Sequence, residues 1–245
     1  MPDVTMVTQR ERPDLVTEVR KLSAASWPTY ILADPVGVRY VPELETRLAE
    51  FQLILLDAGD DTILGTAHSI PFGWNGEPLS LPSGWDEVLK AGMQTVKPTA
   101  LSALSIVVHH EHRGQKLSLL LIRALRKLAL THNLRHFVAP VRPSAKVAYP
   151  LTPMNNYLTW LRPDGTPFDP WVRVHVREGA RILQICWESM VITSTIVEWE
   201  SWTGMRFPEN GKYIIPGGLV PLSVNVESNV AEYVEPNVWM EHSLT

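Results

Sequence analysis

The stretch LSALSIVVHHEHRGQKLSLLLIRALRKLALTHNLRHFVAPV, residues 101–141, decides the fold. Its first eight residues, 101–108, form an apolar run that predicts a buried strand. After the polar turn HHEHRGQK, residues 117–133 place leucine and alanine on one stripe at helical spacing, which predicts an amphipathic helix. Residues 136–141 predict a further strand. We therefore expect a βαβ unit with a polar turn between its first strand and its helix.

That polar turn predicts a site for an anion. The first turn of a helix leaves backbone N–H groups without partners, and the helix dipole adds partial positive charge there. Arg113 and Lys116 can add to it. The chain has 22 Lys and Arg against 26 Asp and Glu, a net charge of −4, which argues against broad binding to nucleic acid or anionic membranes. A phosphate-bearing ligand is therefore expected at this turn alone.

The remaining elements surround the βαβ unit. Before it, the patterns predict strands at residues 4–9, 52–59 and 62–72 and helices at residues 11–26, 42–51 and 85–96. After it, they predict helices at residues 143–149 and 170–178 and strands at residues 181–198 and 219–226. Asp169 and Pro170 are the expected cap and first residue of one helix, and Pro42 is the expected first residue of another. Residues 151–168 are expected to be a loop broken by prolines.

The turn after Val108 resembles the acyl-CoA loop of the GNAT acyltransferase superfamily, Arg/Gln-x-x-Gly-x-Gly/Ala at the start of a helix. The sequence departs from that pattern at two positions. Lys116 stands where the family prefers glycine, and Ser118 stands where it prefers glycine or alanine. The resemblance implies that the loop amides hold the pyrophosphate of an acyl-CoA and that the preceding strand binds the pantetheine arm. The residues implied for this role are Val107, Val108, Arg113, Gly114, Gln115, Lys116, Leu117 and Ser118.

The order of elements in residues 4–150 also resembles the GNAT superfamily, including a glycine, Gly65, near the start of the hairpin's second strand. The family's pattern Asn-x-x-Ala-x-x-x-Tyr is matched at its fourth and eighth places by Ala145 and Tyr149. At its first place, Arg142 stands where the family has asparagine. The resemblance implies an α/β fold with a mostly antiparallel mixed sheet flanked by helices. We expect one domain over residues 1–245, in which 4–150 is the core, 101–132 the CoA-binding unit and 151–245 an elaboration that completes the sheet.

The function implied is transfer of an acyl group, with acetyl favoured, from acetyl-CoA or another acyl-CoA to a small-molecule amine by direct attack. Tyr149 is then the general acid for the departing thiolate, and the Val108 N–H can stabilise the oxyanion. The candidates for the general base are His110, Glu111, Glu198 and Glu200. Two alternatives stay open, a GNAT-fold protein that acts on a carrier-protein thioester and a non-catalytic acyl-CoA-binding relative.

Several features favour ordinary structural roles. His109, His110 and His112 are expected to be solvated turn residues, so no metal is expected. Six of the nine tryptophans lie beyond residue 150, where packing is the favoured role, with an acceptor pocket as the alternative. The single cysteine, Cys186, forms no internal disulfide, and the chain has neither a signal-peptide pattern nor an apolar run long enough to span a membrane. We therefore expect a cytoplasmic protein, with a homodimer as one option for its assembly.

Overall fold

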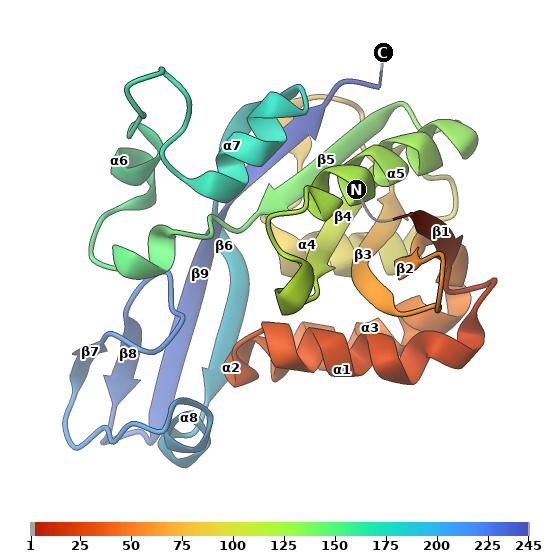
Figure 1. Ribbon diagram of the computed structural model, residues 1–245. Helices are drawn as coiled ribbons and strands as arrows, with labels where there is room; N and C mark the ends of the chain where they lie inside the picture. Colours follow the sequence, from red (N-terminus) through yellow and green to blue (C-terminus); the bar gives the residue numbers. More distant parts are fainter. Residues whose placement is uncertain (1–2, 245) are drawn as a thin grey trace.

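The computed structural model describes residues 3–244, which form a mixed α/β fold around one large sheet (Figure 1). Its strands are β1 (Val4–Thr8), β2 (Leu53–Asp57), β3 (Ile63–Phe72), β4 (Ala100–Val108), β5 (His136–Val141), β6 (Ala180–Ser194), β7 (Gly211–Tyr213), β8 (Leu222–Asn225) and β9 (Val230–His242). The α-helices are α1 (Val16–Ser26), α2 (Thr29–Leu32), α3 (Pro35–Arg47), α4 (Trp85–Gln94), α5 (Leu117–Thr131), α6 (Met154–Leu158), α7 (Pro170–Arg177) and α8 (Ile196–Thr203). The predicted βαβ unit is confirmed as β4, α5 and β5.

The sheet is almost entirely antiparallel, in the order β1-β2-β3-β4-β5-β9-β8-β7, with β6 also paired to β9. Among the described strands, β4 and β5 are the one parallel pair, and their pairing covers three positions and stops at Ser102 and Val138. Beyond that point β4 continues beside β3, and β5 continues beside β9. The predicted fold class is confirmed, and the sheet opens between the C-terminal halves of β4 and β5.

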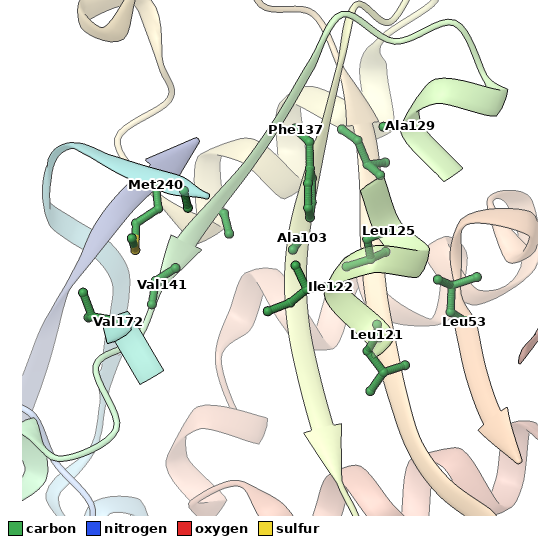
Figure 2. Close-up of a cluster of buried hydrophobic side chains, with 14 of the residues drawn as sticks. Leu53, Ala103, Leu121, Ile122, Leu125, Ala129, Phe137, Val141, Val172 and Met240 are labelled. Carbon is green, nitrogen blue, oxygen red and sulfur yellow. The ribbon is translucent and has the colours of Figure 1, made fainter. Parts of the chain in front are cut away.

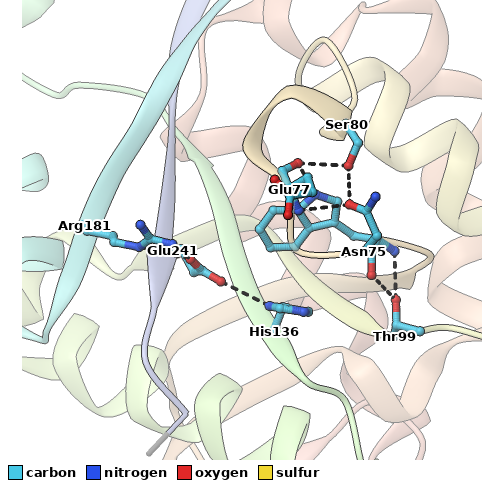
Figure 3. Close-up of polar contacts among 8 residues, drawn as sticks. Asn75, Glu77, Ser80, Thr99, His136, Arg181 and Glu241 are labelled. Atoms are coloured by element: carbon cyan, nitrogen blue, oxygen red, sulfur yellow. Dashed lines mark hydrogen bonds and ion pairs between the residues drawn. The ribbon is translucent and has the colours of Figure 1, made fainter.

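At the other end of the two parallel strands, the Arg135 N–H donates to the Thr99 carbonyl at 2.8 Å, and polar contacts tie both strands to neighbouring elements (Figure 3). His136, at the start of β5, lies 3.2 Å from Glu241 of β9, and Arg181 of β6 pairs with the same carboxylate at 2.7 Å. Thr99, directly before β4, donates to the Trp74 carbonyl at 2.5 Å and accepts from the Trp74 N–H. The divergence of β4 and β5 is therefore confined to the end where the polar turn lies.

Helices cover both faces of the sheet. On one face, α5 buries Leu121, Leu125 and Ala129 against residues of β2, β4 and β5 such as Leu53 and Phe137 (Figure 2). On the other face, α3 and α4 pack against β3, β4 and β9. The periodic leucines that predicted a helix over residues 117–133 are therefore the residues that fix α5 to the sheet.

Three predictions about individual elements are wrong. Pro42 lies inside α3, because the helix already begins at Pro35 with Asp34 as its cap, accepting from the Gly37 N–H. The strand expected at residues 181–198 ends at Ser194. Residues 196–203 form α8, which begins with a capping box between Thr195 and Glu198. The expected loop at residues 151–168 contains the short helix α6. In addition, the 13-residue strand β9 was not predicted. Among residues 3–244 no helix has the length and apolarity needed to cross a bilayer.

Candidate active site

A cavity of about 920 Å³ occupies the opening between β4 and β5. Residues 103–108 of β4 form one wall, and residues 139–142, at and just beyond the end of β5, form another. The loop before α5 and the first turns of α7 border one end of the cavity. Residues of α1, α2 and α3 border the other end. The cavity thus extends from the predicted anion site to the N-terminal helices, and we name the part lined by residues of α1, α2 and α3, together with His68, the acceptor chamber.

The loop before α5 presents backbone N–H groups rather than a large basic surface. Gly114 and Lys116 both adopt left-handed backbone conformations, with φ of 81° and 62°. No backbone N–H from residue 114 to residue 118 has an acceptor in the described part of the chain. Arg113 and Lys116 are exposed and line the cavity. Lys116 therefore holds the conformation that a glycine adopts easily, and the loop keeps its donors free for an anion.

The edge of β4 supplies donors deeper in the cavity. The His109 N–H donates to the Leu64 carbonyl at the start of β3, at 2.9 Å. Backbone N–H direction alternates along a strand, so the N–H of Val108 points away from β3, toward the side from which β5 has diverged. Gly65 lies opposite Val108, and a Cβ atom there would be 2.7 Å from the Val107 carbonyl oxygen. The glycine is thus required for β3 to approach the edge of the site.

The acceptor chamber contains a buried histidine beside a carboxylate. His68, on β3, is 8 % exposed, and its Nδ1 has no partner among the described residues. Burial lowers the pKa of His68, and the charge of Glu45 opposes that shift. Glu45 accepts from both the Nε and the Nη2 of Arg20 of α1, at 2.8 and 2.5 Å. The chamber thus holds a neutral imidazole near a carboxyl group that Arg20 anchors.

The first turns of α7 border the loop end of the cavity. Asp169, the predicted cap, accepts from the backbone N–H groups of Trp171 and Val172 and from those of Ser144 and Ala145. One carboxylate therefore ties the segment after β5 to the start of α7, and the cap prediction is confirmed.

A pair of buried histidines lies on α7 and at the end of β9. His175 Nδ1 lies 2.8 Å from His242 Nε2, and His175 lines the cavity. Burial lowers the pKa of His175 to about 3 and that of His242 to about 4. Both rings are therefore neutral at pH 7, and one must donate to the other.

Comparison with known proteins identifies the family. An arginine N-acetyltransferase of Aspergillus versicolor is 31 % identical, and the match covers 99 % of this chain and 95 % of that protein. The chain belongs to the GNAT superfamily of N-acetyltransferases. The family resemblance and the prediction of an acyltransferase are thus confirmed. No protein-family model matches the chain.

Two solved structures share the GNAT fold along their whole length. The loading GNATL domain of CurA from Lyngbya majuscula superposes with a TM-score of 0.62 at 17 % identity, covering 100 % of this chain and 98 % of that one. A GphF GNAT-like decarboxylase in complex with isobutyryl-CoA gives a TM-score of 0.59 at 17 % identity, with 99 % of each chain covered.

The GNAT loop residues predicted from sequence come together at the cavity, with one exception. Gln115 is absent from the described residues that line it. The residues that line it are Val107, Val108, Arg113, Gly114, Lys116, Leu117 and Ser118. Their role in holding acyl-CoA stays a prediction that this position supports.

Tyr149, the predicted general acid, lies outside the cavity lining and packs in an aromatic cluster. Its ring is 4.9 Å from Trp160, 5.8 Å from Phe168 and 6.0 Å from Tyr157, between ring centroids. Its side chain is about one third exposed, at 37 %. The general-acid role of Tyr149 stays a prediction.

The candidate bases named from sequence also lie outside the lining. His110 and Glu111 belong to the 3₁₀ turn His110–His112, while Glu198 and Glu200 lie on α8. Glu198 completes the capping box, and Glu200 pairs with Arg206 at 2.6 Å.

His68 and Glu45 were missed as candidates from sequence. The available signal for His68 was a lone ionisable side chain within the apolar run of β3.

Three side chains beside the loop, His109, Glu111 and His112, have ligand atoms within 4.8 Å of one another. The expectation that these histidines are solvated and hold no metal stays a prediction, which a zinc titration of the purified protein would check.

Two of the tryptophans beyond residue 150 have different surroundings. Trp199 is fully buried between Tyr30, Trp202 and Tyr233, which confirms packing for that residue. Trp171, in contrast, lines the cavity at the start of α7.

Proposed function

We propose that this protein transfers the acetyl group of acetyl-CoA to the amine of a small molecule, and that the amine belongs to an amino acid such as arginine. The observation that carries the proposal is the loop at residues 113–118, which lines a cavity between two diverging strands and whose N–H groups from residue 114 onward are unpartnered. The A. versicolor relative, named as an arginine N-acetyltransferase, supports the acetyl group and the amino acid.

In this proposal the loop holds the pyrophosphate of acetyl-CoA, and the free edge of β4 binds the pantetheine arm. The thioester then lies in the opening beside Val108, whose N–H donates to the oxyanion as the amine nitrogen attacks the carbonyl carbon. Collapse of the tetrahedral intermediate breaks the C–S bond, and the thiolate takes a proton. Tyr149 remains the proposed source of that proton.

His68 is the proposed base that takes the proton from the attacking amine. It lines the cavity, and burial lowers its pKa, so it is unprotonated and able to accept a proton at pH 7. Glu45 lines the same chamber and has no partner at Oε1 among residues 3–244. Its carboxylate can attract the ammonium form of the acceptor. The pair therefore suits a cationic amine that must lose a proton before attack.

Isothermal titration with acetyl-CoA tests the donor site. Arg113→Ala should weaken acetyl-CoA binding by about fivefold to tenfold, because an exposed guanidinium contributes roughly 1 kcal/mol to a phosphate contact. Arg135→Ala, which removes an exposed arginine between α5 and β5, is the matched control and should leave the affinity unchanged. Absence of acetyl-CoA binding at millimolar concentration would contradict the proposal.

Turnover with a panel of amino acids tests the base. His68→Asn should lower kcat by about 10²-fold or more, the range for a general base, without changing the Kd for acetyl-CoA. His132→Asn is the control, since that ring packs against Phe51 outside the cavity, at 4.4 Å between centroids. Equal activity of the two variants would remove His68 from the mechanism.

A further inference from the structure

Arg142, directly after β5, is held in one orientation by a fully buried carboxylate. Its Nε donates to Oε1 of Glu235 at 2.8 Å, and its Nη2 donates to Oε2 at 2.9 Å. The same Nη2 also donates to the Gly217 carbonyl at 2.7 Å. Two parallel hydrogen bonds to one carboxylate fix the guanidinium plane.

The third nitrogen of Arg142 is left free. Neither N–H of Nη1 has an acceptor among residues 3–244, although the side chain is only 17 % exposed and lines the cavity. A guanidinium keeps its charge at any physiological pH and offers its donors in a fixed fork. Arg142 is therefore a cavity-lining arginine with two N–H donors that no described residue uses.

A buried polar network keeps Glu235 in place behind Arg142. Tyr233 donates its hydroxyl to Glu235 at 2.7 Å, and the Asn237 amide donates to Glu235 at 3.2 Å. Ser189 then donates to the Asn237 carbonyl oxygen at 2.6 Å. A buried ion pair is weak evidence for stability, because apolar residues of similar volume often pack as well or better. A role in orienting Arg142 toward the cavity accounts for this network.

Arg142 lines the cavity close to α2. It is close enough to Tyr30 of α2 for its charge to act on the pKa of that hydroxyl, and Ile31 and Leu32 of α2 line the same end of the cavity. Glu45, on α3, lines the acceptor chamber, and Arg20 holds its carboxylate. The cavity is therefore lined by an arginine with an unpartnered nitrogen, Nη1 of Arg142, and by a carboxyl group with an unpartnered oxygen, Oε1 of Glu45.

We propose that Arg142 binds a carboxylate of the acceptor, so that the enzyme selects amines that carry a carboxyl group. The inference rests on the proposed function, in which the amine lies near His68 and Glu45. A zwitterionic amino acid then matches the chamber at both ends, with its ammonium group toward Glu45 and its carboxylate on Nη1 of Arg142. An amine that lacks the carboxylate leaves Nη1 without a partner and binds more weakly.

The test compares each amino acid with the amine that remains when its carboxyl group is removed, namely arginine with agmatine and lysine with cadaverine. Both kcat/KM with acetyl-CoA and the Kd for the CoA-loaded protein are measured. The wild-type protein should favour the amino acid in both by about 10- to 150-fold, the factor that a charge-assisted hydrogen bond supplies. Glu235→Gln keeps Arg142 and one oxygen to accept from it, so it should keep a reduced preference for the amino acid.

The double variant Arg142→Met/Glu235→Gln removes the guanidinium without leaving Glu235 buried and unpaired, which would threaten folding. It should lose the preference, because binding of the amino acid weakens while that of the decarboxylated amine does not change. Thermal unfolding and the Kd for acetyl-CoA check that it is folded.

The outcomes that contradict the role of Arg142 differ from those that contradict the proposed function. Equal binding of each pair by the wild-type protein, or an undiminished preference in the double variant, overturns the role of Arg142 while amine acetylation stands. Failure of the wild-type protein to acetylate any amine overturns the proposed function, and the binding measurements then judge Arg142 independently.

Discussion

Replacement of Gly65 by alanine should damage the site through the backbone of β4. The added Cβ would lie 2.7 Å from the Val107 carbonyl oxygen and 3.2 Å from Leu121 Cδ1. The first distance is about 0.7 Å inside the 3.4 Å at which ordinary contact begins, and the obstructing atom is backbone. Either β3 or the end of β4 must therefore move, and Val107 and Val108 move with it.

The size of the effect follows from that displacement. Forcing an extra carbon into a packed site costs about 1–3 kcal/mol, and each kcal/mol lowers the Tm of a chain of this size by roughly 2–4 °C. A misplacement approaching 1 Å near the reacting groups costs up to about 10²-fold in rate. We therefore expect Gly65→Ala to lower both Tm and kcat/KM.

Gly73, just beyond the other end of β3, provides a matched control. A Cβ there has no atom within 4 Å, and its φ lies outside the left-handed region, so Gly73→Ala should leave the Tm unchanged or raise it slightly. Differential scanning calorimetry and steady-state kinetics on both variants make the comparison. If Gly65→Ala matches Gly73→Ala in Tm and turnover, the close approach of β3 and β4 does not constrain the site.

Three further predictions concern the loop, the buried histidines and the aromatic cluster. In urea denaturation, the free energy of unfolding of Lys116→Gly should exceed that of Lys116→Ala by up to about 1 kcal/mol, because glycine adopts the left-handed conformation without strain. Both variants should weaken acetyl-CoA binding, because both lose the charge of Lys116. The pKa values of His175 and His242 are lowered in the folded state, so the unfolded chain binds protons first and stability is lost as the pH falls below about 6.5. Replacing both with glutamine should reduce this loss of stability by about 2.4 kcal/mol between pH 6 and pH 5, and an unchanged slope would refute the assignment. If Tyr149 is the general acid, Tyr149→Phe lowers kcat by about 10²-fold or more in single-turnover kinetics with the Kd for acetyl-CoA unchanged, whereas parallel loss of both indicates packing.

Local sequence was enough to predict the elements that carry the CoA loop. Periodic leucines and an uninterrupted apolar run specify α5 and β4 without reference to distant residues, because they report which face is buried. The cap at Asp169 is equally local, since the side chain accepts from N–H groups two and three residues along the chain. Pro42 predicted the wrong start for this helix because Asp34 and Pro35 begin α3 about two turns earlier, and tertiary packing tolerates a proline inside it.

The sequence by itself determined the family, the fold class and the loop that is proposed to bind acyl-CoA, since these depend on short segments and their order. Only the tertiary structure decided where the acceptor chamber lies. It placed β9, which carries Glu235, beside β5, and so fixed Arg142, 93 residues away in the chain. It also placed His68, on β3, and Glu45, on α3, in the lining of the same cavity. Such convergence depends on strand pairing between distant segments and on which face of each element is left uncovered, and neither is encoded in local periodicity.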